Sequence, residues 1–187
     1  KTNLYKSSVE KFTKQAPEKI AYNFISEDGI ETKLSYVELN AKVSKLANGF
    51  KSLGVKKGDV IAIYLPMIEE AIISILAAAK IGAVQTIVFS GYSSESLKTR
   101  LQDCHAKILL TSDGFHRKGK DISQKTTVDN AVIDTDIEKI IVVSYKGIDK
   151  FEKSDKIQFY DDLILQQEDT CDTEIMNSED PLFILYT

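Results

Sequence analysis

The chain has 187 residues, of which 43% are hydrophobic and 28% charged, and its formal net charge at pH 7 is −4. These proportions are typical of a soluble globular protein and exclude an intrinsically disordered chain. The acidic balance argues against a nucleic-acid-binding protein, which needs a basic face to neutralise phosphates. Basic side chains still outnumber acidic ones in residues 1–120, so a local site for a small phosphorylated ligand remains open.

The two cysteines, Cys104 and Cys171, match neither a disulfide framework nor a CxxC metal site. We therefore expect two reduced thiols, which favours a cytoplasmic protein. The opening stretch KTNLYKSSVEKF is charged and has no apolar segment, so no signal peptide is expected.

Residues 1–58 form a leading segment in which a β-hairpin and a helix are expected. The hairpin spans residues 20–36, where two apolar runs flank Asp28-Gly29, a strong turn signal. The sequence SYVE then predicts a capping box between Ser35 and Glu38. The helix that it opens is expected to end at Gly54. Its apolar face would carry Leu39, Val43, Leu46, Ala47 and Phe50.

The longest apolar stretch, residues 71–89, is long enough to raise the question of a membrane span. Lys80 lies in its middle, and KIGAV is typical of a helix end followed by a strand. A membrane helix carries few or no central charges. The stretch therefore predicts a buried helix and a buried strand, with no membrane insertion.

Residues 59–145 repeat a strand-then-helix pattern. Strands are expected at 59–65, 83–89, 106–112 and 139–145, with helices at 68–81, from Ser93 or Ser94 to about Cys104, and more weakly at 123–133. Such alternation predicts an α/β fold, a mostly parallel sheet flanked by helices.

The last two segments differ in character. Residues 146–180 are expected to be a mostly charged loop region with a short apolar patch at YDDLILQ. Residues 181–187 predict a buried strand entered through Pro181. In open α/β sheets, ligands bind at the carboxyl ends of such strands.

Two turns after predicted strands are candidate sites. The loop DGFHRKGK, residues 113–120, offers cations suited to phosphate oxygens and a glycine that permits close approach. The alternative is an ordinary solvated surface loop. The turn FSGYSSES, residues 89–96, combines Gly91 with a helix start that presents free N–H groups. Its alternative is a plain turn with a serine cap.

Several familiar motifs are missing from the sequence. It has no GxGxxG after a strand, no GxSxG and no GxxxxGK[ST]. His105 and His116 do not have metal-ligand spacing with either cysteine. No catalytic residue and no metal ligand can therefore be nominated.

The run YLPMIEEAIISILAAAKIGAVQTIVFSGYSSESLKTRLQDCHAKILLTSDGFHRKGK closely resembles the amino-terminal region of AMP-forming acetyl-CoA synthetases, members of the adenylate-forming superfamily. The resemblance covers essentially the whole chain and is strongest at 59–120 and 178–187. It implies that residues 1–187 are part of the large amino-terminal, AMP-binding domain. The final strand would lead into a Ser/Thr/Gly-rich loop that holds the ATP phosphates, with Thr187 as its first residue.

The resemblance implies a ligase reaction in two steps. A small carboxylic acid attacks the α-phosphate of Mg-ATP, and the coenzyme A (CoA) thiol then displaces AMP from the acyl-adenylate. The catalytic groups and most of the ATP and Mg²⁺ sites would lie in the remainder of the enzyme, so residues 1–187 alone are expected to be inactive. A homo-oligomer is left open.

The same resemblance assigns the candidate sites to CoA. In the family an Arg-x-Gly-Arg run grips the CoA nucleotide phosphates, and here it is Arg117-Lys118-Gly119-Lys120. Lysine at the fourth position keeps the charge but loses the bidentate fork. Gly91 matches the second glycine of a pair near the pantetheine, whereas Ser90 departs from the first.

Two alternatives remain beside acetate activation. One is a synthetase for propionate, a hydroxy acid or a longer acid. The other is a non-catalytic module that binds CoA or a nucleotide with the same fold.

Overall fold

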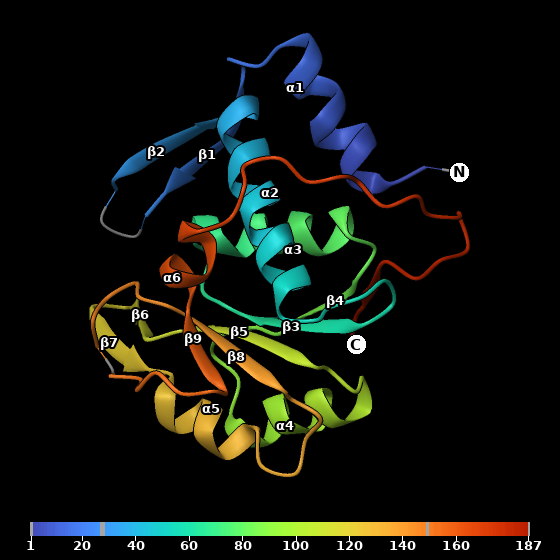
Figure 1. Cartoon of the computed structure of the whole chain (residues 1–187). Helices are drawn as coiled ribbons and strands as arrows, with labels where there is room; N and C mark the ends of the chain where they lie inside the picture. The colour runs from blue at the N-terminus through green and yellow to red at the C-terminus, as the bar shows by residue number, and fades with distance from the viewer. Residues whose placement is uncertain (1, 27–28, 149, 187) are drawn as a thin grey trace.

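The computed structural model describes residues 2–26, 29–148 and 150–186. Its centre is a six-stranded sheet in the order β10-β4-β3-β5-β8-β9, in which neighbouring strands run parallel (Figure 1). The strands are β3 (Val60–Tyr64), β4 (Val84–Ile87), β5 (Ile108–Ser112), β8 (Lys139–Val143), β9 (Ile157–Phe159) and β10 (Phe183–Ile184). The predicted α/β class is confirmed.

Helices cover both faces of this sheet (Figure 1). One face packs against α2 (Tyr36–Ser52), α3 (Glu69–Lys80) and α6 (Tyr160–Leu165), and the other against α4 (Ser94–Asp103) and α5 (Lys125–Ala131). Strand side chains alternate between the two cores. Ile61 and Ile63 enter the first, whereas Ala62 and Tyr64 enter the second. This two-sided burial explains why the strand sequences are continuously apolar.

The leading segment contains the predicted hairpin, β1 (Ile20–Ile25) paired with β2 (Glu31–Ser35). Its turn residue Asp28 lies outside the described residues. The capping box is confirmed, because Ser35 N donates to Glu38 Oε2 at 2.8 Å and Glu38 N donates to Ser35 Oγ at 3.4 Å. All five predicted apolar residues of α2 are buried.

Two short helical elements precede this hairpin, a π-helical turn η1 (Lys6–Glu10) and α1 (Lys11–Gln15). They were not predicted. Tyr5 and Val9 are buried in the same core as α2 and α3, so this segment belongs to the packed domain.

The stretch at 71–89 forms most of α3 and all of β4, as expected. Lys80 is the last residue of α3 and is 3% exposed. No helix in the described part of the chain is long and apolar enough to span a bilayer.

Residues 146–180 contain more regular structure than expected. Ile157 and Phe159 belong to β9, which pairs with β8, and Tyr160 and Leu163 bury their side chains at the start of α6. This charged segment therefore contains an edge strand and a short helix, both of which pack against the rest of the domain. Residues 168–177, called the strap below, then run back over the α2 and α3 side of the molecule (Figure 1).

A strand is present within the predicted range 181–187, of which residue 187 is not described, but the expectation that it is buried is wrong. Only Phe183 and Ile184 form β10, which pairs with β4 at the edge of the described sheet. Phe183 is 52% and Leu185 is 63% exposed. Apolar composition indicates a strand, but it does not state how many neighbours that strand has in the described part of the chain.

Candidate functional site

The segment DGFHRKGK, expected as a loop, is the tip of a second antiparallel hairpin. It consists of β6 (Gly114–Arg117) and β7 (Lys120–Ser123), with Arg117 opposite Lys120. The turn residues Lys118 and Gly119 have φ values of +52° and +75°. Two-residue hairpin turns of type I′ require positive φ at both positions. Gly119 thus has a conformational role that does not depend on a ligand.

The hairpin is anchored at the carboxyl end of β5 by buried polar residues. Ser112 Oγ donates to the Gly114 carbonyl at 2.9 Å and also bonds Gln124. The Asp113 carboxylate accepts from the backbone N–H groups of Tyr145 and Lys146, each at 3.0 Å. These bonds fix the direction in which the hairpin leaves the sheet.

The two candidate sites meet in space. The Arg117 guanidinium lies 5.4 Å from the centre of the Phe89 ring, which precedes Gly91 by two residues. A Cβ placed on Gly91 would lie 2.6 Å from Phe89 Cε1 and 2.9 Å from Arg117 Nη1. Contacts that close are essentially forbidden, so glycine permits this approach. The turn after β4 and the hairpin after β5 are therefore in contact, and we treat them as one candidate site.

The buried residue Tyr64 connects the turn after β4 with the hairpin after β5. It is the last residue of β3, which lies between β4 and β5, and its ring is 1% exposed. The Tyr64 hydroxyl donates to the Tyr92 carbonyl at 2.8 Å, and the Tyr64 carbonyl accepts from Gln124 Nε2 at 3.5 Å. Burial raises the pKa of this phenol. Sequence reasoning missed Tyr64, because an aromatic residue in an apolar strand indicates only a core position.

The surface of this site combines cations with aromatic rings. Arg117, Lys118 and Lys120 are all exposed. Phe89 and Tyr92 are 53% and 42% exposed and contact each other edge to face, with ring centres 5.8 Å apart. Cations at the surface bind phosphate oxygens through charge-assisted hydrogen bonds, and exposed rings accept a flat base or an apolar chain.

The location of the site agrees with a general rule for open sheets. The chain passes from β3 to β4 on one side and then back across β3 to β5 on the other, so the strand order reverses here. Ligands bind outside the carboxyl ends of the strands at such a reversal.

The remaining sequence candidates do not join this site. Ser93 is the cap of α4, since its side chain accepts from Ser96 N at 3.3 Å. His105 contacts Asp136 at 2.7 Å, and Cys104 is a buried free thiol. Thr187 lies outside the described residues. Within the described ranges, no three His, Cys, Asp or Glu side chains gather closely enough to hold a metal ion.

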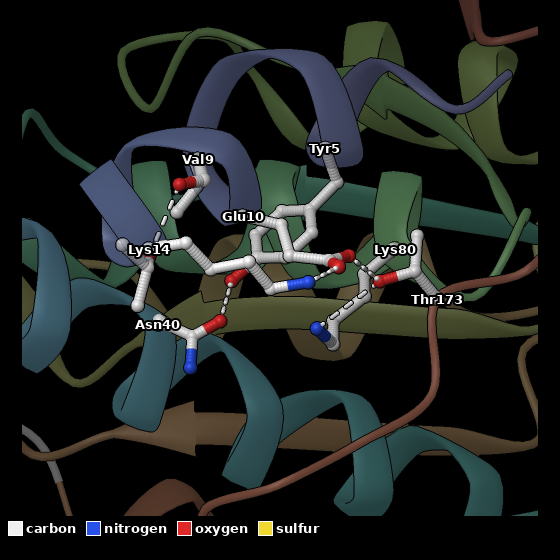
Figure 2. A network of polar contacts seen from close by, with 8 residues as sticks. Tyr5, Val9, Glu10, Lys14, Asn40, Lys80 and Thr173 are labelled. Atoms are coloured by element: carbon white, nitrogen blue, oxygen red, sulfur yellow. Dashed lines mark hydrogen bonds and ion pairs between the residues drawn. The ribbon is translucent and has the colours of Figure 1, made fainter.

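A second polar cluster lies on the α2 and α3 side of the sheet (Figure 2). The Lys80 ammonium lies 4.1 Å from the centre of the Tyr5 ring and donates to Thr173 Oγ1 at 3.3 Å. Thr173 donates in turn to Glu10 Oε2 at 3.0 Å, and Tyr5 OH donates to Asn40 Oδ1 at 2.8 Å. Burial lowers the pKa of Lys80 and raises that of Tyr5. This cluster joins η1, α2, α3 and the strap.

Comparisons with known proteins show which family the chain resembles. The family described as AMP-binding enzyme matches residues 9–187. The acetyl-coenzyme A synthetase of Methanothrix thermoacetophila is 46% identical over all of this chain, and that of a gamma-proteobacterium is 40% identical. The chain spans 29% and 30% of the lengths of these two relatives. The structure of acetoacetyl-CoA synthetase from Streptomyces lividans superposes with a TM-score of 0.89 at 25% identity, covering 99% of this chain and 28% of that one.

Proposed function

The chain belongs to the AMP-binding enzyme family, and on that premise we propose that it is the amino-terminal part of an AMP-forming acetyl-CoA synthetase. The whole enzyme would convert acetate and ATP to an acetyl-adenylate and pyrophosphate, and then transfer the acetyl group to CoA with release of AMP. Identity of 46% to an acetyl-CoA synthetase over the whole chain supports acetate as the acid.

The observation that carries the CoA assignment is the contact between the cationic hairpin and the turn at Gly91. Arg117 would hold the CoA phosphates through its planar fork, and Lys120 would add a point charge across the hairpin. Lys118 and Gly119 form the turn that sets the spacing of those two side chains. Gly91 would leave room for the pantetheine beside Arg117.

The remaining parts of the proposal concern ATP and the cell. Thr187 would begin the loop for the ATP phosphates, and Mg²⁺ would arrive with ATP, supplying charge neutralisation at the phosphates. No described residue of this chain is assigned to the metal. The two separate free thiols favour a cytoplasmic location.

The test is Arg117→Ala in the enzyme that contains this chain. We expect the KM for CoA to rise roughly 10- to 100-fold, because a hydrogen bond to a charged group contributes about 1.5–3 kcal/mol. Acetate-dependent ATP–pyrophosphate exchange should stay normal, since it precedes CoA binding. Lys33→Ala is the matched control, because Lys33 is an exposed cation on the other hairpin and pairs with Glu31. Equal losses in both assays would contradict the CoA assignment.

A further inference from the structure

One cation next to the proposed CoA site is enclosed by two tyrosines. Arg100 lies near the end of α4, and its guanidinium carbon is 4.7 Å from the centre of the Tyr92 ring and 5.1 Å from that of Tyr186. Its Nη1 donates to the Ser96 carbonyl at 2.8 Å, which fixes the plane of the group. Arg100 thus connects two segments that are 94 residues apart in the sequence.

The first segment is the turn at the CoA site. Tyr92 follows Gly91, and its ring contacts the Phe89 ring, on which the Arg117 guanidinium lies. The contacts therefore form a continuous series in which cations and aromatic rings meet. The series runs through Arg117, Phe89, Tyr92, Arg100 and Tyr186.

The second segment is the end of the described chain, where Tyr186 precedes the proposed ATP loop. The Tyr186 hydroxyl donates to Asp103 Oδ2 at 2.7 Å and lies 3.3 Å from the Arg100 carbonyl oxygen. Tyr186 is therefore held by both its ring and its hydroxyl on the last turn of α4.

Arg100 is not needed to pack α4 onto the sheet. Leu97 and Leu101 perform that task, since both are fully buried in the second core. The guanidinium instead lies half-buried between two rings that belong to different segments. A planar guanidinium can stack on two rings at once, whereas an ammonium cannot do so with the same geometry.

We propose that Arg100 is a positioning residue that fixes the turn of the proposed CoA site at Tyr92 relative to Tyr186, the residue before the proposed ATP loop. This inference rests on the function proposed above. Thioester formation requires the CoA thiol to meet the acyl-adenylate in a defined geometry, and a misplacement of about 1 Å can cost roughly 100-fold in rate. A rigid connection between the two binding segments supplies that geometry.

The experiment compares Arg100→Met, Arg100→Lys and the control Lys98→Met in the whole enzyme. Lys98 is on the same helix but pairs with Asp134, and neither ring contact involves it. For Arg100→Met we expect a KM for ATP raised roughly 3- to 10-fold in pyrophosphate exchange and thioester formation slowed about 10-fold. The Kd for CoA, measured by calorimetry, should change less than about twofold, because Arg117 is intact. Arg100→Lys should recover part of both losses.

Two results would overturn the positioning role. One is Arg100→Met behaving like Lys98→Met in every constant. The other is an equal fall of kcat in both half-reactions with an unchanged KM for ATP, which would indicate only a smaller fraction of folded enzyme. Arg117→Ala, measured in parallel, tests the CoA site separately. An unchanged Kd for CoA in that variant would overturn the CoA assignment, whatever the results for the Arg100 variants.

Discussion

Lys80 and Arg117 both place a cation over an aromatic ring, but in opposite surroundings. Lys80 lies 4.1 Å from the Tyr5 ring centre and is 3% exposed, whereas Arg117 lies 5.4 Å from the Phe89 ring centre at the surface. A buried cation loses its hydration and must find partners inside the protein. Lys80 finds the Tyr5 ring and the Thr173 hydroxyl, which belong to two distant segments.

Burial, more than the type of contact, distinguishes Lys80, a structural cation, from Arg117, which is proposed to bind a ligand. Cation–π contacts contribute about 0.5–1 kcal/mol at exposed sites and about 2 kcal/mol or more when desolvated. The Lys80 contact can therefore stabilise the fold, whereas Arg117 contributes little to stability and keeps its charge accessible to an anionic ligand.

The sharpest test of this contrast is a pair of truncations. Tyr5→Ala removes a fully buried ring from beneath Lys80 and should lower the free energy of unfolding by about 3–5 kcal/mol. Arg117→Ala should change it by no more than about 0.5 kcal/mol, because the side chain is exposed. Urea unfolding followed by circular dichroism measures both. Comparable losses in the two variants would remove the distinction between the clusters.

The sequence predicted the sheet and its covering helices because burial on both faces leaves continuous apolar runs, as in Val60–Tyr64. It also predicted the capping box at Ser35, since that motif acts over three residues. Local signals of this kind need no knowledge of the rest of the fold. The sequence predicted β10 as buried, whereas among the described residues it has a neighbouring strand on one side only, and the number of neighbours is a tertiary property.

The candidate site was predicted in parts. The cations at 117–120 and Gly91 were identified separately, from residue types and from a family resemblance. No sequence pattern states that the turn after β4 meets the hairpin after β5, because β3 separates them in the sheet. Tyr64 and Arg100 were missed for the same reason, since their partners lie in other segments.

A second comparison at Lys80 separates its charge from its stem. Lys80→Ala should lower the free energy of unfolding by about 2 kcal/mol, because removing the buried methylene groups leaves a cavity. Lys80→Met keeps most of that volume and should change stability by less than about 1 kcal/mol, since removing a buried charge also removes its desolvation cost. The same urea titration provides both values. If Lys80→Met costs as much as Lys80→Ala, the charge itself holds the strap.

Gly119 tests the surface hairpin in a similar way. Its φ of +75° is unfavourable for any residue with a Cβ, although no other group lies within 4 Å of that position. Gly119→Ala should therefore lower stability by about 1 kcal/mol through backbone strain alone. The KM for CoA should rise as the spacing between Arg117 and Lys120 changes. Gly29→Ala, at φ +77° with equal space, is the control that should not affect CoA.

Alkaline pH distinguishes the buried phenol from the surface cations. Burial raises the pKa of Tyr5 above its ordinary value of 10.0, so above pH 10 the unfolded state loses a proton that the folded state keeps. The stability due to this phenol is complete below pH 10 and falls as the pH rises further. Tyr5→Phe keeps the ring beneath Lys80 and should flatten part of this decline. The rest should remain, because burial also raises the pKa values of four other tyrosines, Tyr22, Tyr64, Tyr160 and Tyr186. The measurement is the melting temperature as a function of pH between 9 and 11. The same slope in Tyr5→Phe and in the unaltered protein would contradict the role of Tyr5.

Lys120 lies opposite Arg117 on the hairpin, and its replacement by arginine should have a modest effect. Lys120→Arg would present a second planar fork to the CoA phosphates, and bidentate pairs hold phosphate more strongly than a point charge does. We expect the KM for CoA to fall by roughly two- to fivefold, with stability and pyrophosphate exchange unchanged. Lys33→Arg on the other hairpin controls for an added guanidinium at the surface. A KM that rises in Lys120→Arg would mean that the compact ammonium, and not the charge alone, fits the phosphate beside Arg117.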